Sequence, residues 1–317
     1  MYYYFRLALK KIKIFLYNKF EKKVKSDPSV DLYSFILFLI KETFKNLIVT
    51  KKGIYYKTEI ANNNEPGIIS QARLISLLCD GYNKEHFPIK DNNLIEKLTN
   101  YLITLKKKND LYHLSNYKWD KQDEGIASVW SAIALIKAYE VLGKKIYLDE
   151  SLSVCTAMLK DLYSARSGLV HTAGQDFWCI NASSKFAYLC SLILKYYYSE
   201  EIKEAMLNSI SICTKNIAED GHFPYTKAHP GVYILLYHPS VIFYMEKCLE
   251  SEYLDDEFKL NLNKVNKTAF TYLLKCLDNS GRFNEPEFKE YNFYKITAVT
   301  ALAAIADKIE RDQEKKS

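Results

Sequence analysis

Apolar residues at helical spacing alternate along the chain with polar or glycine-containing segments. Side chains that are apolar at every third or fourth position predict amphipathic helices. We expect helices at 31–49, 68–80, 92–107, 125–142, 148–162, 181–198, 202–218, 236–250, 257–277 and 292–310. Long loops and short turns alternate between these helices. The pattern therefore predicts antiparallel helical hairpins whose long loops all lie at one end.

The long loops share a second pattern, in which a small or polar residue, often glycine, precedes a short apolar or aromatic run. The five stretches are Gly53-Ile54-Tyr55-Tyr56, Asp110-Leu111-Tyr112-His113-Leu114, Ser167-Gly168-Leu169-Val170-His171, Asp220-Gly221-His222-Phe223-Pro224-Tyr225 and Ser280-Gly281-Arg282-Phe283. They recur about every sixty residues, a period that suits long hairpins arranged in a ring. Helices 125–142 and 292–306 are rich in small residues and suit an inner layer. Helices 148–162 and 202–218 carry more charge and suit an outer layer.

Composition supports an all-α chain. Only 10 glycines and 7 prolines occur in 317 residues, fewer than the many turns of a β-sandwich require. We expect one ring domain at 29–310, preceded by a separate segment at 1–28 and followed by a charged tail at 311–317. The seven scattered cysteines form no CxxC motif, which is typical of buried thiols in a reducing compartment.

The positive charge of the chain is concentrated at its beginning. Residues 2–25 have the pattern of a basic amphipathic helix, and residues 1–26 hold eight Lys and Arg against one Glu. Such a helix either packs on the ring with its lysines in solvent or contacts an anionic membrane surface. We see no signal-peptide pattern and no apolar run of membrane-spanning length, so we expect a cytoplasmic protein, peripheral at the inner membrane face. The remainder is nearly neutral, which argues against nucleic-acid binding.

Five of the six histidines lie in or beside the long loops and would gather at one mouth of the ring. They are His113, His171, His222, His229 and His238. Aromatic and polar residues expected at the same mouth include Trp119, Trp178, Tyr56, Tyr225, Tyr237, Tyr291, Glu124, Asp176, Asn181, Arg282 and Asn284. A concave site lined by aromatic rings with a few convergent polar groups is a typical ligand site. Aromatic faces suit the apolar faces of sugar rings, and the polar groups suit their hydroxyl edges.

Hairpins with glycine-aromatic loops at one end, as in Asp220-Gly221-His222-Phe223, resemble the (α/α) toroid of glycan-processing enzymes. These comprise six-hairpin glycosidases, toroidal polysaccharide lyases and some sugar epimerases. An Asp-Gly turn before Tyr237-His238 is similar to a lyase pattern, although the gap is longer here and no β-sandwich pattern follows. The resemblance implies an incomplete barrel of about five to six hairpins. Terpenoid cyclases and protein prenyltransferases share the toroid, but their Asp-rich motif is missing.

Three chemistries fit these residues. Hydrolysis needs two carboxylates, for which Asp123, Glu124, Asp176 and Glu285 are candidates. In β-elimination or C5-epimerisation of a uronic acid, His222, Tyr225, Tyr237 or His238 would be the base, and Asn181 or Arg282 would neutralise the carboxylate. Paired histidines could epimerise other sugars. Each of these residues also has a possible structural role. Glu124 would stabilise the positive end of a helix dipole, and Asp220 would form a turn. His238 would cap the start of a helix, and Trp178 would lie in the core.

The sequence therefore predicts a saccharide-active enzyme of surface-glycan metabolism that acts by acid/base chemistry as a lyase, epimerase or hydrolase. The expected catalytic residues are His222, Tyr225, His238, Tyr237, Glu124 and Asp176. The expected substrate-binding residues are Trp178, Asn181, His171, His229, Trp119, Tyr56, His113, Arg282, Asn284 and Tyr291. The expected partner is an oligo- or polysaccharide, with no cofactor and no metal. A non-catalytic toroid that binds a glycan or protein, and a terpenoid or prenyl enzyme, are the alternatives.

Overall fold

The computed structural model describes residues 47–50, 53–56, 67–82, 90–113, 124–227 and 237–276. Their helices are α3 (Ile68–Tyr82), α4 (Asn92–Thr104), α5 (Glu124–Leu142), α6 (Lys145–Asp161), α7 (Ile180–Leu194), α8 (Glu200–Lys215), α9 (His238–Cys248) and α10 (Asp256–Lys275). Their strands are β1 (Leu47–Thr50), β2 (Gly53–Tyr56), β3 (Tyr163–Ser164) and β4 (Gly168–Leu169). The predicted segments 1–28, 292–310 and 311–317 lie outside the described residues.

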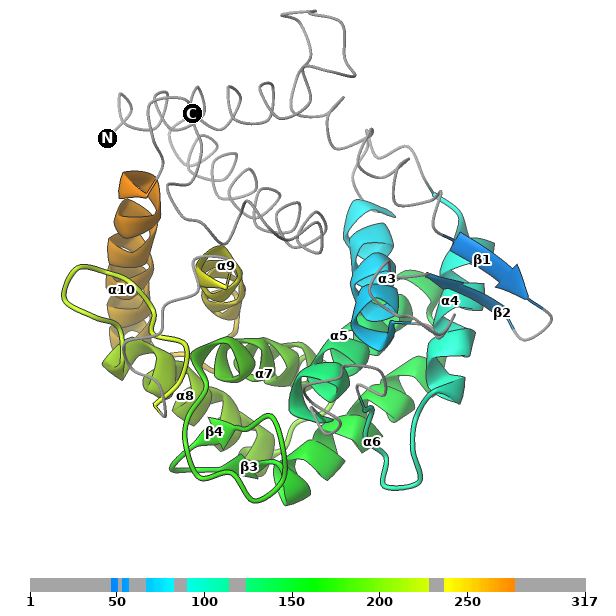
Figure 1. The fold of residues 1–317 in the computed structure, drawn as a ribbon, viewed down its shortest axis with the longest axis horizontal. Helices are drawn as coiled ribbons and strands as arrows, with labels where there is room; N and C mark the ends of the chain where they lie inside the picture. Colours follow the sequence, from blue (N-terminus) through cyan, green and yellow to red (C-terminus); the bar gives the residue numbers. More distant parts are fainter. Residues whose placement is uncertain are drawn as a thin grey trace, which may run out of the picture.

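The described helices form an arc of two layers (Figure 1). The inner layer runs α3, α5, α7, α9, and each of these helices packs against the next. The outer layer runs α4, α6, α8, α10, and each of these packs against the inner helix that precedes it in the chain. Hairpins of one inner and one outer helix, repeated around a centre, are the (α/α) toroid expected from the sequence.

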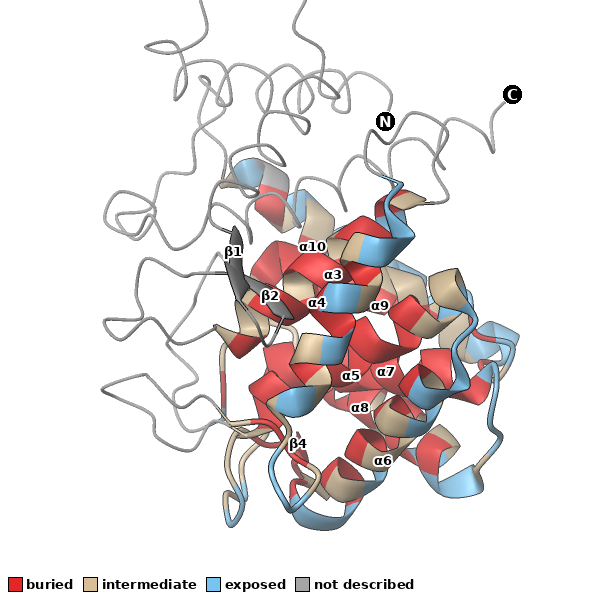
Figure 2. Cartoon of the chain, turned by 90° about the vertical axis from the view of Figure 1, so that its right-hand side faces the viewer, coloured by how far each residue is buried: buried red, intermediate tan, exposed pale blue. Residues whose placement is uncertain are grey.

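Burial distinguishes the two layers (Figure 2). All fifteen residues of α7 are buried, as is every residue of α5 from Gly125 to Ala138, because neighbours cover these helices on several sides. In α6 only one face is buried, through Tyr147, Ser151, Val154, Cys155, Met158 and Leu159. That spacing is the one-sided stripe of an amphipathic helix. The inner assignment made from helix composition is therefore confirmed for α5, and the outer assignments are confirmed for α6 and α8.

Helix α5 corrects one expectation from the sequence. Its 19 residues are long and apolar enough to cross a membrane by length and composition, whereas no such run was expected. Most of that stretch, 78%, is buried inside the ring. A helix that is apolar on all sides belongs either in a membrane or in the core of a large protein. The packing of α5 against α3, α6 and α7 makes it the central helix of the core.

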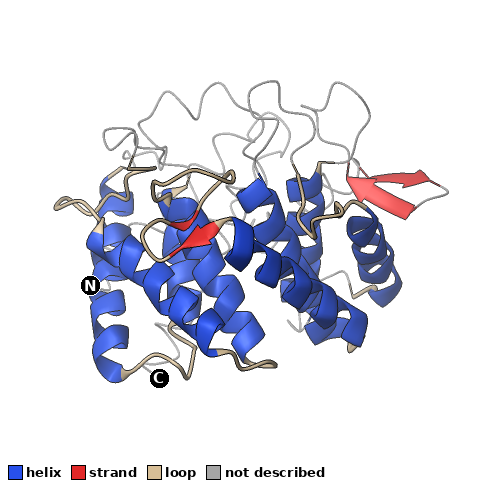
Figure 3. Cartoon of the chain, turned by 90° about the horizontal axis from the view of Figure 1, so that it is seen from below, coloured by secondary structure: helices blue, strands red, loops and turns tan. Residues whose placement is uncertain are grey.

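The long loops gather at one end of the helices (Figure 3). Two of them make the same turn. The Asp110 N–H donates to the Lys107 carbonyl, and the Gly221 N–H donates to the Ala218 carbonyl at the equivalent point. Asp110 and Gly221 both have positive φ, at 61° and 99°. In the loop between them, Tyr163–Ser164 pairs with Gly168–Leu169 as a short antiparallel hairpin. The repeated glycine-aromatic pattern therefore marks repeated tight turns.

The first loop differs from the predicted boundary. Helix 31–49 was expected to reach residue 49, but Leu47–Thr50 is a strand and pairs with Gly53–Tyr56, with Leu47 opposite Tyr56. Ile48, Val49 and Thr50 are β-branched, and such residues favour a strand when a partner is available. Gly53 is the first residue of β2 and pairs with Thr50. Tyr56, an expected substrate-binding residue, is the last residue of β2.

Candidate functional site

The long loops fold back onto the first turns of inner helices. The Gly125 N–H at the start of α5 donates to the His171 carbonyl at 2.9 Å. At the start of α7, the Ile180 N–H donates to the Tyr225 carbonyl, and the Lys227 N–H donates to the Trp178 carbonyl. Each loop thus carries its side chains across the beginning of the neighbouring inner helix. These contacts bring together sequence segments about fifty residues apart, which is the consequence of the repeat.

His171, Cys179 and Asn181 form a polar chain over the start of α7. The Sγ of Cys179 lies 2.9 Å from the Nε2 of His171, and its thiol donates to the Oδ1 of Asn181 at 2.8 Å. Because a thiol has one hydrogen, Nε2 of His171 is the donor in the first contact. The Cys179 thiol thus links the His171 ring to the Asn181 side chain.

Tyr225 and Tyr237 continue this site towards α9. Their rings stack with centroids 5.5 Å apart, and the His171 ring meets Tyr225 edge-on at 6.1 Å. Both tyrosines line a small pocket between the starts of α7 and α9, with a cavity of about 10 Å³. The complete lining is Ile180, Asn181, Phe223, Pro224, Tyr225, Tyr237, His238 and Val241. We call it the α7–α9 pocket. It unites five expected site residues: Tyr225, Tyr237, His238 and Asn181 in its wall, with His171 beside them.

His238 contributes through its hydrogen bonds to the backbone. It is 1% exposed, its Nδ1 accepts from the Phe223 N–H, and its Nε2 donates to the Ala269 carbonyl at 2.8 Å. Burial lowers the pKa of His238 to about 4, so the ring is neutral near pH 7. A neutral imidazole with one donor and one acceptor matches both partners. The structure therefore favours a positioning role, in which His238 holds the loop against α9 and α10.

His222, also an expected catalytic residue, faces a different element. Its Nδ1 lies 2.7 Å from the Asp220 carboxylate, and its ring lies 5.7 Å from that of Tyr272 on the outer helix α10. A Cβ on Gly221 would come within 2.7 Å of the Thr268 carbonyl, so the turn lies directly on α10. Burial acts to raise the pKa of Asp220, but hydrogen bonds from His222 lower it overall. His222 is not among the residues that line the α7–α9 pocket.

The remaining expected residues lie apart from the pocket wall. His113 Nε2 and Glu124 Oε1 are 3.0 Å apart, in an orientation that makes no hydrogen bond. Asp176 is exposed in the loop before α7, and Trp178 is half-buried against the core. Trp119, His229, Arg282, Asn284 and Tyr291 lie outside the described residues. Within the parts of the chain that the structure describes, no cluster of His, Cys, Asp and Glu could hold a metal ion.

Four residues that the sequence did not single out meet beneath the loop end. The Arg73 guanidinium lies 4.7 Å from the centroid of the Trp130 ring. The Lys185 ammonium lies 5.8 Å from the same ring and 5.5 Å from the Tyr244 ring. Trp130 and Tyr244 meet edge-on at 5.7 Å. We call these four the cation–aromatic layer. Its sequence signal was Lys185, the one charged residue of α7, since a buried lysine is rare.

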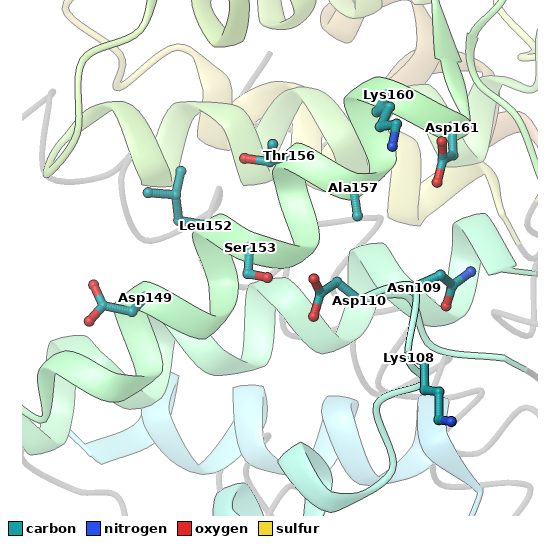
Figure 4. Close-up of a pocket in the computed structure, with 10 residues that line it drawn as sticks. All are labelled: Lys108, Asn109, Asp110, Asp149, Leu152, Ser153, Thr156, Ala157, Lys160 and Asp161. Carbon is teal, nitrogen blue, oxygen red and sulfur yellow. The ribbon is translucent and has the colours of Figure 1, made fainter.

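A larger and more open hollow lies on the outer face of the molecule (Figure 4). Its volume is about 610 Å³, between the loop at 108–110 and the outward side of α6. Lysines and aspartates alternate around it, with Lys108, Lys160, Asp149 and Asp161 on its rim. Mixed exposed charges of this kind are typical of a solvated helix face. The hollow lies outside the ring and away from the residues that converge on the α7–α9 pocket.

Solved structures with the same fold were found by comparison. They include a glycosyl hydrolase family 88 protein from Bacteroides vulgatus, with a TM-score of 0.62, 11% identity and coverage of 96% of this chain and 99% of the other. An unsaturated glucuronyl hydrolase from Bacillus sp. GL1 has a TM-score of 0.55 and 13% identity, with coverage of 75% and 73%. Cellobiose 2-epimerase from Bacillus thermoamylovorans B4167 has a TM-score of 0.54 and 11% identity, with coverage of 86% and 76%.

These identities are too low to carry more than the fold. No protein-family model and no curated protein sequence matches the chain. The three structures are toroids of glycan-processing proteins, and this chain shares their architecture over most of its length. The expected (α/α) toroid, including its resemblance to the glycan-processing toroids, is therefore confirmed.

Proposed function

We propose that this protein is a saccharide-active enzyme whose active site is the α7–α9 pocket at the loop end of the toroid. The observation that carries the proposal is the stacked pair Tyr225 and Tyr237, with His171 and the Asn181 amide beside it. The aromatic faces suit a sugar ring, and the phenols, imidazole and amide suit its hydroxyls. Fold neighbours named as a glycosyl hydrolase and a cellobiose 2-epimerase support this class of substrate.

Acid/base chemistry at a carbon atom fits the pocket better than hydrolysis by two carboxylates. Hydrolysis requires two carboxyl groups about 5 to 9.5 Å apart, and no carboxylate lines the α7–α9 pocket. In β-elimination from a uronic acid, a base takes the proton from C5 and the C4–O bond breaks. The electron pair forms the C4–C5 double bond, and a general acid protonates the leaving oxygen. Tyr225 and Tyr237 are suited to these two roles.

Epimerisation uses the same groups in another order. One group removes the proton from the carbon, and a second group on the opposite face returns a proton, which inverts the centre. The Asn181 amide, held by Cys179, would donate to the adjacent carboxylate or carbonyl and stabilise the negative charge that develops there. Both reactions therefore use Tyr225, Tyr237 and Asn181, and the products distinguish them.

Substitution of the phenols tests the proposal. Tyr225→Phe and Tyr237→Phe keep the stacked rings and remove only the hydroxyls, so each that acts as acid or base should lower kcat by about a hundredfold or more. Tyr197→Phe is the control, since Tyr197 is 50% exposed just beyond α7, at the short-turn end. The assay follows unsaturated products, epimers and reducing ends from a panel of acidic and neutral oligosaccharides. Full activity in both variants would remove the phenols from the mechanism.

One observation favours a second function, glycan binding without turnover. The cavity of the α7–α9 pocket is about 10 Å³, far below the roughly 300–1,000 Å³ typical of ligand sites, so a sugar would contact its rim rather than enter it. A binder would retain oligosaccharides in equilibrium dialysis and release them unchanged. The proposed enzyme would instead convert at least one saccharide of the panel, and this conversion would be lost in the phenylalanine variants.

The role in surface-glycan metabolism and the position at the cytoplasmic membrane face belong to the same proposal. They rest on the basic residues of segment 2–25, such as Lys10, Lys13 and Lys22. Polybasic segments bind anionic lipid by electrostatic attraction, which salt weakens. We expect the full chain to float with vesicles containing phosphatidylserine and to remain behind with neutral phosphatidylcholine vesicles. Equal behaviour with both vesicles would contradict membrane attachment through this segment.

A further inference from the structure

The short turns form the end of the toroid opposite the long loops (Figure 3). Among the described residues, the large apolar side chains with the greatest exposure are Ile146, Tyr196, Tyr197, Tyr198 and Leu260. All five lie in a short turn or within about one helical turn of one, at the start of α6, between α7 and α8, or at the start of α10. Exposed apolar side chains are normal when scattered, whereas a group of them at one end marks an interaction site.

Tyrosine rings extend across this end from one hairpin to the next. The Tyr196 ring meets that of Tyr139 in α5 edge-on, with centroids 5.0 Å apart. The Tyr198 ring lies 5.6 Å from that of Tyr253, in the turn between α9 and α10. Tyr197 lies between the two pairs in the chain and is half exposed. We call these five residues the tyrosine surface.

Carboxylates hold two of the tyrosine hydroxyls while the rings stay exposed. The Tyr196 hydroxyl donates to Glu140 Oε1 at 3.2 Å, and the Tyr198 hydroxyl donates to Glu200. The hydrogen bond raises the pKa of Tyr198 and, with a second one from Lys203, lowers the pKa of Glu200. The phenol is therefore neutral and the carboxylate charged near pH 7. A carboxylate that accepts from a phenol makes the ring face more negative, which strengthens its attraction for a cation.

The charge around the tyrosine surface is negative. Segments 195–204 and 247–260 hold the two turns that carry four of its tyrosines, and they contain eight Asp and Glu against four Lys. In the turn before α6, Lys144 and Lys145 each pair with a carboxylate. A negative surface repels anionic lipid, nucleic acid and the same surface of a second copy. The charge therefore favours a cationic partner.

Exposed aromatic faces beside carboxylates are suited to guanidinium and ammonium groups, which stack on the rings and pair with the carboxylates. We propose that the tyrosine surface binds a segment of a partner protein that is rich in arginine and lysine. Its cations would lie on the rings of Tyr197 and Tyr198 and pair with Glu200 and the exposed Glu252. Because this surface lies at the end opposite the α7–α9 pocket, the inference is independent of the proposed enzyme function.

Fluorescence anisotropy of a labelled peptide of alternating arginine and glycine, titrated with the full chain, tests the proposal. We expect binding that weakens as salt is raised, and no binding of the matched glutamate–glycine peptide. Tyr197→Leu combined with Tyr198→Leu should raise Kd by about fivefold or more, because leucine stays apolar but has no ring face. Tyr197→Phe combined with Tyr198→Phe keeps both ring faces and should leave Kd within about twofold.

Charge variants test the carboxylates separately. Glu200→Gln combined with Glu252→Gln should raise Kd by about threefold or more, whereas Glu219→Gln, an exposed position at the loop end, should leave it within about twofold. Circular dichroism of each variant excludes unfolding as the cause.

Four results would overturn the proposal. Absence of peptide binding, or equal Kd in the leucine variant and the unaltered chain, would show that the rings bind no cation. Equal losses in the leucine and phenylalanine variants would assign the contact to the hydroxyls. Displacement of the peptide by a neutral oligosaccharide would make the tyrosine surface a glycan site. Self-association of the chain that the leucine variant abolishes would assign the surface to a second copy.

Discussion

At the scale of single residues, burial assigns different roles to three loop histidines that look alike in sequence. His238 is fully buried, and both of its ring nitrogens contact backbone groups. His222 is partly exposed and pairs with Asp220 on the side of α10. His171 contacts Cys179 and Tyr225 beside the α7–α9 pocket. Because acid/base chemistry requires contact with the substrate, His171 is the histidine best placed for it.

His238 makes stability depend on pH. Burial lowers its folded-state pKa from 6.5 to about 4, so the unfolded chain takes up a proton first as pH falls. The folded state should therefore lose up to roughly 3 kcal/mol between about pH 6.5 and pH 4. Urea unfolding at pH 7 and pH 4.5 measures this loss. It should be smaller in His238→Gln, whereas His222→Gln, which changes the nearby partly exposed imidazole, should retain most of it.

Two glycines give a matched test of close approach. A Cβ on Gly125 would come within 2.0 Å of the Val170 carbonyl oxygen, whereas a Cβ on Gly143 would have no atom within 4 Å. Gly143→Ala should lower the free energy of unfolding by only about 1–2 kcal/mol, because alanine is strained at the positive φ of this residue. Gly125→Ala should cost more, about 3 kcal/mol or more, because the loop at 170–171 must separate from α5. A smaller loss of Tm in Gly125→Ala than in Gly143→Ala would contradict this contact.

At the scale of elements, the sequence predicted best a helix that neighbouring helices cover on all sides. The apolar, small-residue-rich composition of 125–142 predicted the inner helix α5, because a helix covered on all sides needs apolar residues all round. The segment 181–198 was predicted as a helix, without a layer, and forms the inner helix α7. The helix prediction failed at residues 47–50. The apolar run continues there, but these residues form a strand that pairs with Gly53–Tyr56. Periodicity alone does not separate a short strand from the end of a helix.

The candidate site was predictable only in part, for a similar reason. The glycine-aromatic repeat identified the loops, and so placed Tyr225, Tyr237 and Asn181 at one end of the ring. It gave no information on which face of a loop each side chain occupies, and His222 proved to face α10. Nor did it indicate Arg73 or Lys185, which lie within helices on the ring interior. Their convergence on Trp130 depends on the packing of α3, α5 and α7 together.

At the scale of the whole molecule, the backbone N–H groups of the two layers should differ in their protection from hydrogen exchange. Residues of α5 and α7 are buried on all sides, whereas α6 and α8 expose one face. Opening an outer helix leaves the contacts between inner helices in place, so local unfolding should begin in the outer helices. Hydrogen exchange should therefore be slowest in peptides from 125–138 and 180–194 and faster in those from 145–161 and 200–215. Uniform protection across both layers would instead indicate a single cooperative opening.

The composition of α5 has a consequence for synthesis. The ribosome releases α5 before α6 and α7, which later cover it, and by length and composition it could enter a bilayer. Lys137 opposes this, because a lysine at the centre of an inserting helix costs about 2.5–3.5 kcal/mol, and less towards its end. After folding, the same ammonium pairs with Asp80 at 2.6 Å, and although burial lowers its pKa, Asp80 raises it overall. The same side chain thus makes membrane insertion of α5 less favourable and, in the folded chain, joins α5 to α3.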